Sequence, residues 1–291
     1  MTAGGAMRIR ERNGRHVRPR DHLVATLSAI AMLAALTATA GSRDDRDRRA
    51  TRSAGDFEWR GRIAAGQAIE IKGVNGGIVA EPSTGTQVEV RATKQARKSD
   101  PDEVRIEVIE HADGVTICAM YPTPRGQKEP NACQPGEGGR MNTHNNDVQV
   151  EYIVRVPAGV RFIGRTVNGS IEARGLRSDT EAHTVNGSVG ISTRGVARAT
   201  TVNGSIDAKM GAVLREPLEF ETVNGGITLV VPAGSGAELR ATTVNGDITT
   251  DFPLTVRGKF SHRRVSGTIG RGGPQLMMST VNGDIRLRSA S

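Results

Sequence analysis

Hydrophobic and polar residues alternate with a period of two along most of the chain after residue 56. Before the middle of the chain, four segments show this pattern clearly: 67–72, 87–92, 104–109 and 148–156. Such alternation predicts strands that bury one face and expose the other. We therefore expect residues 56–291 to form one all-β domain.

A short motif repeats through the second half of the same region. The tripeptide Val-Asn-Gly occurs seven times, and threonine precedes six of the copies. The last six asparagines are separated by 18, 17, 21, 21 and 37 residues, and a degenerate copy at 265–269 would split the longest interval into 21 and 16. The asparagines of the seven copies are Asn75, Asn168, Asn186, Asn203, Asn224, Asn245 and Asn282.

Each repeat predicts two short strands and two turns. Because Asn and Gly tolerate positive φ, an Asn-Gly pair between apolar segments is a strong turn signal. Two architectures fit, a meander of hairpins and a solenoid whose equivalent strands pair in parallel. We favour a single-stranded β-solenoid or β-helix with about 16–21 residues per coil. In that fold the asparagines would stack as a ladder of turns, and Phe57 and Trp59 would cap the first coil.

Composition agrees with a narrow core and argues against nucleic acid as a partner. The chain has 36 glycines and only 3% aromatic residues. Its net charge is +8, but residues 1–40 supply +4 of that charge. The remaining residues are therefore only mildly basic, so the charge does not indicate a nucleic-acid partner.

The amino-terminal segment has the features of an export signal. Six arginines precede an apolar run at 23–36, which the sequence Ala38-Thr39-Ala40 follows. This pattern predicts a signal peptide at 1–40, although an uncleaved membrane anchor is the alternative. Residues 41–55 mix both charge signs and predict a flexible linker. We expect a periplasmic or cell-surface location, with no membrane span once the signal is cleaved.

Two cysteines stand in an exported chain. Cys118 ends an alternating apolar stretch, and Cys133 lies in a segment at 122–146 that is rich in Pro, Gly and Asn. Export implies an oxidising compartment, so we predict a disulfide that pins this loop to the strand. Closing a loop of about 15 residues would contribute about 3 kcal/mol in the chain-entropy treatment.

Several segments together resemble a known family. They are FEWRG at 57–61, IEIKGVNGGI at 69–78, the block at 100–122, the block at 146–162 and the repeated TVNGSI or TVNGDI. The set resembles the "putative adhesin" family of exported β-strand-repeat domains of unknown function. The resemblance implies a β-solenoid-like domain of bacterial envelope proteins, and the family has no agreed catalytic residues to transfer.

We find no catalytic, cofactor or metal site in the sequence. The histidines outside the signal segment are His111, His144, His183 and His262, and none stands in a nucleophile–base arrangement. We expect His183, beside a turn, to be an ordinary solvated histidine. The Asp of the two Asn-Gly-Asp copies is replaced by Ser or Gly elsewhere, which argues against a ladder of calcium ligands.

Three functions remain after these exclusions. The first is a non-enzymatic envelope module that presents a rigid face to an envelope protein or a glycan, as an adhesin would. The alternative is a β-helix polysaccharide lyase or hydrolase, which would need charged residues projecting from adjacent coils, and no repeat column is consistently charged. The third is an ice-binding surface made of the threonines, which the drift of the period disfavours.

Overall fold

The computed structural model describes residues 52–53, 56–256 and 261–290. All of them belong to one compact unit, Arg49–Ser291. The predicted signal peptide lies outside the described residues, as does most of the predicted linker at 41–55. Two residues of that linker segment form the short strand β1 (Arg52–Ser53), which pairs antiparallel with β5.

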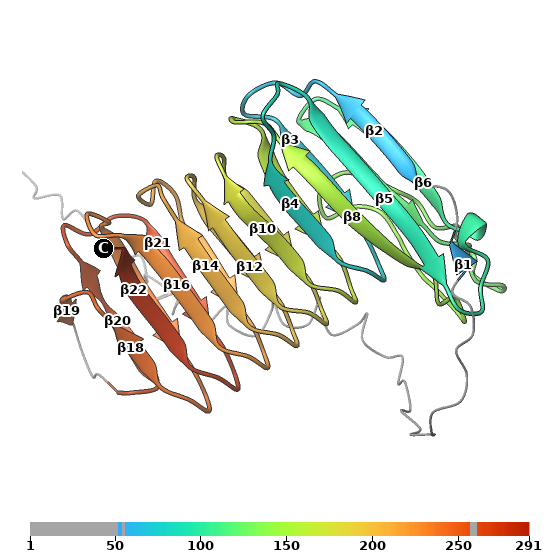
Figure 1. The fold of residues 1–291 in the computed structure, drawn as a ribbon. Coiled ribbons are helices and arrows are strands. Elements are labelled where there is room, and N and C mark those ends of the chain that lie inside the picture. The colour runs from blue at the N-terminus through green and yellow to red at the C-terminus, as the bar shows by residue number, and fades with distance from the viewer. Residues whose placement is uncertain (1–51, 54–55, 257–260, 291) are drawn as a thin grey trace, which may run out of the picture. The chain divides into compact units, whose positions relative to one another are not determined.

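The strands form two sheets of eleven strands each, here called sheet A and sheet B (Figure 1). In spatial order sheet A contains β1, β5 (Val88–Ala96), β8 (Gln149–Val156), β4 (Ile78–Pro82), β10 (Ile171–Leu176), β12 (Val189–Thr193), β14 (Ile206–Met210), β16 (Ile227–Pro232), β22 (Ile285–Ala290) and β18 (Ile248–Thr250), while β2 (Phe57–Gly61) pairs with β5. Sheet B contains β19 (Leu254–Val256), β20 (Arg264–Ile269), β17 (Ala237–Thr242), β21 (Gln275–Ser279), β15 (Leu218–Glu221), β13 (Ala197–Thr200), β11 (Thr180–His183), β9 (Arg161–Arg165), β3 (Ala68–Lys72), β7 (Gly114–Met120) and β6 (Arg105–His111). A short 3-10 helix, η2 (Pro101–Glu103), precedes β6.

Each central coil contributes one strand to each sheet, and equivalent strands pair in parallel. In sheet A, Ile171 lies opposite Val189 of the next coil, and in sheet B, Ala182 lies opposite Ala199. The parallel solenoid is therefore confirmed, and a meander of hairpins is wrong for these coils. A Thr-Val-Asn-Gly turn joins the two strands of each coil along one edge.

The core lies between the two sheets and consists of the alternate residues of each strand. Ile171, Val189, Ile206, Ile227 and Ile285 open five successive strands of sheet A, and their exposed fractions are 0–1%. Small residues of sheet B such as Ala182 face the same interior. Burying each large aliphatic side chain contributes about 1.5–3 kcal/mol, which the alternation of the sequence supplies once per strand.

The strands do not stack in chain order at either end. The coil made of β3 and β4 lies between β7 and β8 on one side and β9 and β10 on the other. At the carboxy-terminal end, β21 and β22 insert between β15–β16 and β17–β18. Figure 1 shows this insertion as the red strand β22 between the orange strands β16 and β18.

One expectation about the repeat is wrong. The segment 265–269, interpreted as a degenerate turn, lies within β20, which pairs antiparallel with β17 and places Gly267 opposite Leu239. The chain reverses direction here and covers the edge of sheet B, instead of adding another parallel coil. Covering an edge in this way leaves fewer unpaired backbone groups for another chain to join.

Aromatic residues help to close the amino-terminal end. Phe57 and Trp59 lie on edge strand β2, half-buried, and pack against the core together with Ile106 and Val108 of β6. They occupy the position that the sequence suggested for a cap. Among the described residues, no helix is long and apolar enough to cross a membrane.

Candidate functional site

The seven asparagines form one ladder along the turn edge. Six of the Nδ2 atoms donate a hydrogen bond of 2.7–2.8 Å to the Oδ1 of the asparagine in the neighbouring coil, from Asn168 onto Asn75 and so on to Asn245 onto Asn282. Asn75 Nδ2, at the start of the ladder, donates to Val148 O at 3.5 Å. The order in space is Asn75, Asn168, Asn186, Asn203, Asn224, Asn282 and Asn245. The ladder uses these amides internally, so it joins coils and offers little to a ligand.

The sequence suggested that the motif needs glycine to adopt a positive φ, but the structure shows a different requirement. Among the described residues, no ladder asparagine has a positive φ, and of the motif glycines only Gly76, Gly246 and Gly283 do. A Cβ at Gly187 would overlap the carbonyl oxygen of Gly169 in the adjacent coil, and the other copies repeat this crowding. Glycine is therefore required mainly because backbones of neighbouring coils approach closely.

The motif threonines are buried. Their exposed fractions are 1–6%, and their hydroxyls donate to glycine carbonyls of the adjacent coil, for example Thr184 Oγ1 to Gly169 O at 2.8 Å. The threonine column therefore lies inside the fold. An ice-binding surface made of these threonines is consequently wrong.

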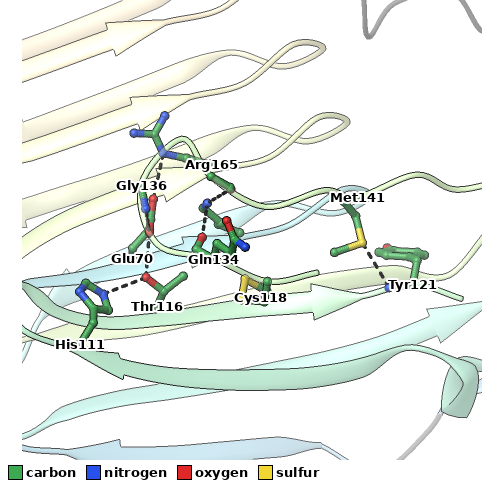
Figure 2. The surroundings of a disulfide bond; sticks show 12 residues. Glu70, His111, Thr116, Cys118, Tyr121, Gln134, Gly136, Met141 and Arg165 are labelled. Atoms are coloured by element: carbon green, nitrogen blue, oxygen red, sulfur yellow. Dashed lines mark hydrogen bonds and ion pairs between the residues drawn. A yellow bond between two sulfur atoms is a disulfide. The ribbon is translucent and has the colours of Figure 1, made fainter. Parts of the chain in front are cut away.

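The predicted disulfide joins Cys118 on β7 to Cys133 in the loop, with a Cα–Cα distance of 5.9 Å. The loop lies on the outer face of sheet B and bonds to β3 (Figure 2). Lys72 Nζ donates to the carbonyl oxygens of Gln134 (2.6 Å) and Gly138 (2.9 Å), and the Gly136 amide donates to Glu70 Oε2 (2.9 Å). The loop at 122–146 is thus fixed to the sheet by more than its covalent bond.

A cavity of about 170 Å³ lies between this loop and the sheet. Its lining is mixed: the disulfide, Met141 and Val167 are apolar, while Lys72 and Arg165 bring positive charge. Burial lowers the pKa of Lys72, and the nearby Glu70 carboxylate opposes that effect. The cavity can therefore receive a small group with both apolar and polar atoms.

A polar network extends from the loop across adjacent coils of sheet B. Glu70 is only 3% exposed and accepts hydrogen bonds from Thr116 Oγ1 (2.8 Å) and Arg165 Nε (3.0 Å). The second carboxylate on Arg165 is Glu181, whose Oε1 lies 2.9 Å from Nη2. A buried carboxylate is stable only when it is paired and hydrogen-bonded, and this network provides both.

His183 continues this network, contrary to the expectation of a solvated, isolated histidine. Its Nε2 lies 2.6 Å from Glu181 Oε1, and its Nδ1 lies 2.6 Å from Thr200 Oγ1. The hydrogen bond from His183 lowers the pKa of Glu181, which favours the ionised form of this carboxylate. The side chain of His183 is therefore held between an acid and a hydroxyl from the neighbouring coil.

Two columns of the repeat build this surface, and alignment on the motif threonine would have revealed them. In four neighbouring strands of sheet B, the residue just before the motif threonine is Arg165, His183, Thr200 or Glu221, and Lys72 holds the equivalent position before Gly73 in the first copy. The residue two positions earlier is Glu70, Ile163, Glu181, Arg198 or Glu219. Neither column has a single charge sign: the first runs from basic Lys72 and Arg165 to acidic Glu221, and the second mixes acidic, apolar and basic residues. The expectation of a uniformly charged column therefore misses both.

Comparison with known proteins gives a family and a set of similar structures. The Toastrack DUF4097 family profile matches residues 139–288. No curated protein matches the chain. A "putative cell adhesion protein" from Clostridium sporogenes aligns with a TM-score of 0.41 and 10% identity, covering 81% of this chain and 100% of that one. A "putative adhesin" from Bacteroides fragilis gives 0.36 and 10%, covering 81% and 97%, and one from Parabacteroides distasonis gives 0.25 and 12%, covering 80% and 97%.

Proposed function

Since this chain belongs to the Toastrack DUF4097 family, we propose that it is a non-enzymatic interaction module of the cell envelope. The signal peptide predicted at 1–40 supports a periplasmic or surface location. The module would present the outer face of sheet B to an envelope protein or a glycan, in the manner of an adhesin. The disulfide-pinned loop and the cavity beneath it would form the centre of the contact.

One observation supports this proposal above the others. Side chains from adjacent coils are already held in fixed positions by the bonds from Glu70 through Arg165 and Glu181 to His183. A partner would meet a surface whose side chains lose little conformational freedom on binding. A pre-organised polar surface on a rigid sheet suits recognition better than a flexible one would.

Crosslinking in living cells tests the proposal. Ile163 lies on sheet B between Glu70 and Glu181 in register, so a photo-reactive amino acid there should capture the partner. Val244 is 53% exposed on the turn edge and is the matched control position. We expect one specific envelope component, a protein or a glycan identified by mass spectrometry, to be captured at position 163 and not at 244.

A second variant tests whether the disulfide-pinned loop contributes to that capture. Combining the crosslinker at position 163 with Cys133→Ser should reduce the yield of the adduct, because the loop is no longer pinned beside the surface. Equal capture at both positions, or none at 163, would contradict a docking face on sheet B.

A specific observation also supports the alternative, a polysaccharide lyase or hydrolase. The geometry of Glu181, His183 and Thr200 places a potential general base beside a carboxylate and a hydroxyl. Against this function, Arg165 binds both Glu70 and Glu181, so neither carboxylate is free to transfer a proton. Cleavage of anionic polysaccharides that disappears in His183→Ala would favour the enzyme over the interaction module.

A further inference from the structure

Sheet A gathers basic side chains along one margin of its outer face. Because the central strands are parallel, their carboxyl ends meet at the same edge of the sheet. Five exposed basic residues lie on or directly after these ends. We call them the basic margin: Arg174, Arg177, Arg194, Lys209 and Arg288.

Three residues of the basic margin, Arg174, Lys209 and Arg288, lie on alternate strands of sheet A. Lys209 on β14 lies opposite Ser192 and Val230, and Val230 lies opposite Arg288 on β22. Arg174 occupies a bulge of β10, where the next residue, Gly175, donates its amide to Ser192 Oγ at 2.7 Å. Neighbouring strands lie about 4.8 Å apart, so a positive charge recurs about every 10 Å across the sheet.

These charges are only lightly neutralised within the protein. Within the described part of the chain, the only ion pair of the basic margin joins Arg174 to Glu172, at 3.6 Å. The next row of the same face, toward the Asn-Gly turns, contains the carboxylates of Glu172 and Asp207 and also Arg286, which forms an ion pair with Asp284 at 2.7 Å. A linear polyanion would therefore be attracted to the margin and repelled by Glu172 and Asp207 in the adjacent row, which favours binding along the margin.

We propose that the basic margin binds an extended anionic polysaccharide that runs across the strands of sheet A. This goes beyond the interaction proposed for sheet B, because it assigns a second surface, on sheet A, and specifies its ligand as an anionic polysaccharide. Its acidic groups would meet Arg174, Lys209 and Arg288, while its hydroxyls would meet polar groups such as Ser192.

Nucleic acid fits this surface less well. The rows that form the margin contain no aromatic side chain on which bases could stack, and stacking is the usual basis of single-strand binding. Duplex DNA carries one charge about every 1.7 Å, which is much denser than the spacing of the margin. A polysaccharide with one acidic group every one or two sugars is a better match to widely spaced cations.

The test compares two triple variants of the full chain that make the same change in charge. Arg194→Gln/Lys209→Gln/Arg288→Gln removes charge from the margin, and Arg105→Gln/Arg240→Gln/Arg264→Gln removes it from exposed positions of sheet B. The probe is polygalacturonate, with dextran as the neutral control. We expect salt-sensitive binding to polygalacturonate and none to dextran, with at least a tenfold loss of affinity in the first triple and less than a twofold change in the second.

Three results would overturn the proposal. An equal loss in both triples would indicate general electrostatic attraction, and absence of polygalacturonate binding would remove the ligand class. Equal binding of single-stranded DNA would assign the margin to nucleic acid instead. Circular dichroism of both triples checks the fold, and crosslinking at position 163 tests the sheet B surface separately, so the two proposals can fail independently.

Discussion

At the residue scale, the distance between neighbouring coils limits the size of the side chain in each turn. The Asn-Gly turns of adjacent coils are joined by backbone hydrogen bonds, such as Gly187 N to Asn203 O at 3.0 Å, and leave no room for a Cβ. The asparagine beside each glycine adds a further hydrogen bond to its neighbour, worth about 1 kcal/mol. The repeated motif thus encodes stacking of coils rather than a chain reversal alone.

A pair of glycine substitutions tests that interpretation. Gly187→Ala should lower the free energy of unfolding by at least about 2 kcal/mol, because the new methyl overlaps the Gly169 carbonyl and the coils must separate. Gly234 has open space around its Cβ position and no positive φ, so Gly234→Ala should change stability by no more than about 1 kcal/mol. Urea denaturation followed by circular dichroism measures both. Similar midpoints for the two variants would mean that the turn glycines are not limited by close approach.

Two glutamates on the outer face of sheet B should affect stability in opposite directions. The hydrogen bond from His183 lowers the pKa of Glu181, so its ionised form stabilises the fold above the unfolded pKa and that contribution is lost as pH falls through the folded pKa. Burial, together with Glu219, raises the pKa of Glu221, so stability is lost as pH rises through its folded pKa.

Substitution by glutamine should therefore separate them at pH 7. Glu181→Gln should destabilise the protein, by about 1 kcal/mol after allowance for solvent screening, and Glu221→Gln should stabilise it slightly. At pH values below the folded pKa of Glu181, where both carboxyls are protonated, each variant should approach the wild type. Denaturation midpoints measured from pH 3 to pH 8 decide this. If both substitutions moved the denaturation midpoint in the same direction at pH 7, the pKa values of Glu181 and Glu221 would not be shifted in opposite directions.

At the element scale, the sequence predicts strands and the disulfide well, and it fails where a strand reverses. Period-two alternation and the motif spacing place β10 to β16 correctly, because each coil obeys the same local rule. The segment 265–269 has the residues of a coil turn, yet β20 pairs antiparallel with β17. Pairing partners depend on which edges remain open after the other coils have stacked, and local sequence does not encode that.

The polar network on sheet B could not be predicted from the local sequence for a related reason. In the sequence His183 stands in no nucleophile–base arrangement, whereas in the fold it contacts Glu181 of its own strand and Thr200 of the next coil. Only the parallel register brings residues 17 apart in sequence into hydrogen-bond contact. Once that register is assumed, the columns of the repeat predict most of the network from Lys72 to Glu221.

The disulfide-pinned loop is an element whose contribution can be measured separately. Reducing the Cys118–Cys133 bond should lower the free energy of unfolding by about 3 kcal/mol, the loop-closure value for a 15-residue separation. Hydrogen exchange of the Gly136 amide should accelerate, because its bond to Glu70 depends on the loop staying in place. The Gly187 amide in the central turns is the internal control and should not change. Unchanged exchange at Gly136 would mean that the contacts of Lys72 and Glu70 alone fix the loop.

At the scale of the whole molecule, the end of the chain is not the end of the stack. The last coil in sequence, β21 and β22, pairs on both sides in both sheets, while the coil made of β17 and β18 lies outside it. Solenoid stability is roughly a sum of coil and interface terms. Residues near the carboxyl terminus therefore contribute to two interfaces, and residues 248–250 contribute to one.

Matched truncations of two isoleucines test this topology directly. Ile285 is completely buried and lies opposite both Ile227 and Ile248, whereas Ile248 is 9% exposed and pairs in register only with Ile285. If the stack followed chain order, Ile285→Ala, only six residues from the terminus, would be the milder change. The insertion predicts the reverse: Ile285→Ala should cost about 3–5 kcal/mol and Ile248→Ala about half as much, because the cavity left at 285 is enclosed by coils on both sides. Urea denaturation of the two variants measures the difference, and an Ile248→Ala variant as unstable as Ile285→Ala would contradict the inserted order of the last coil.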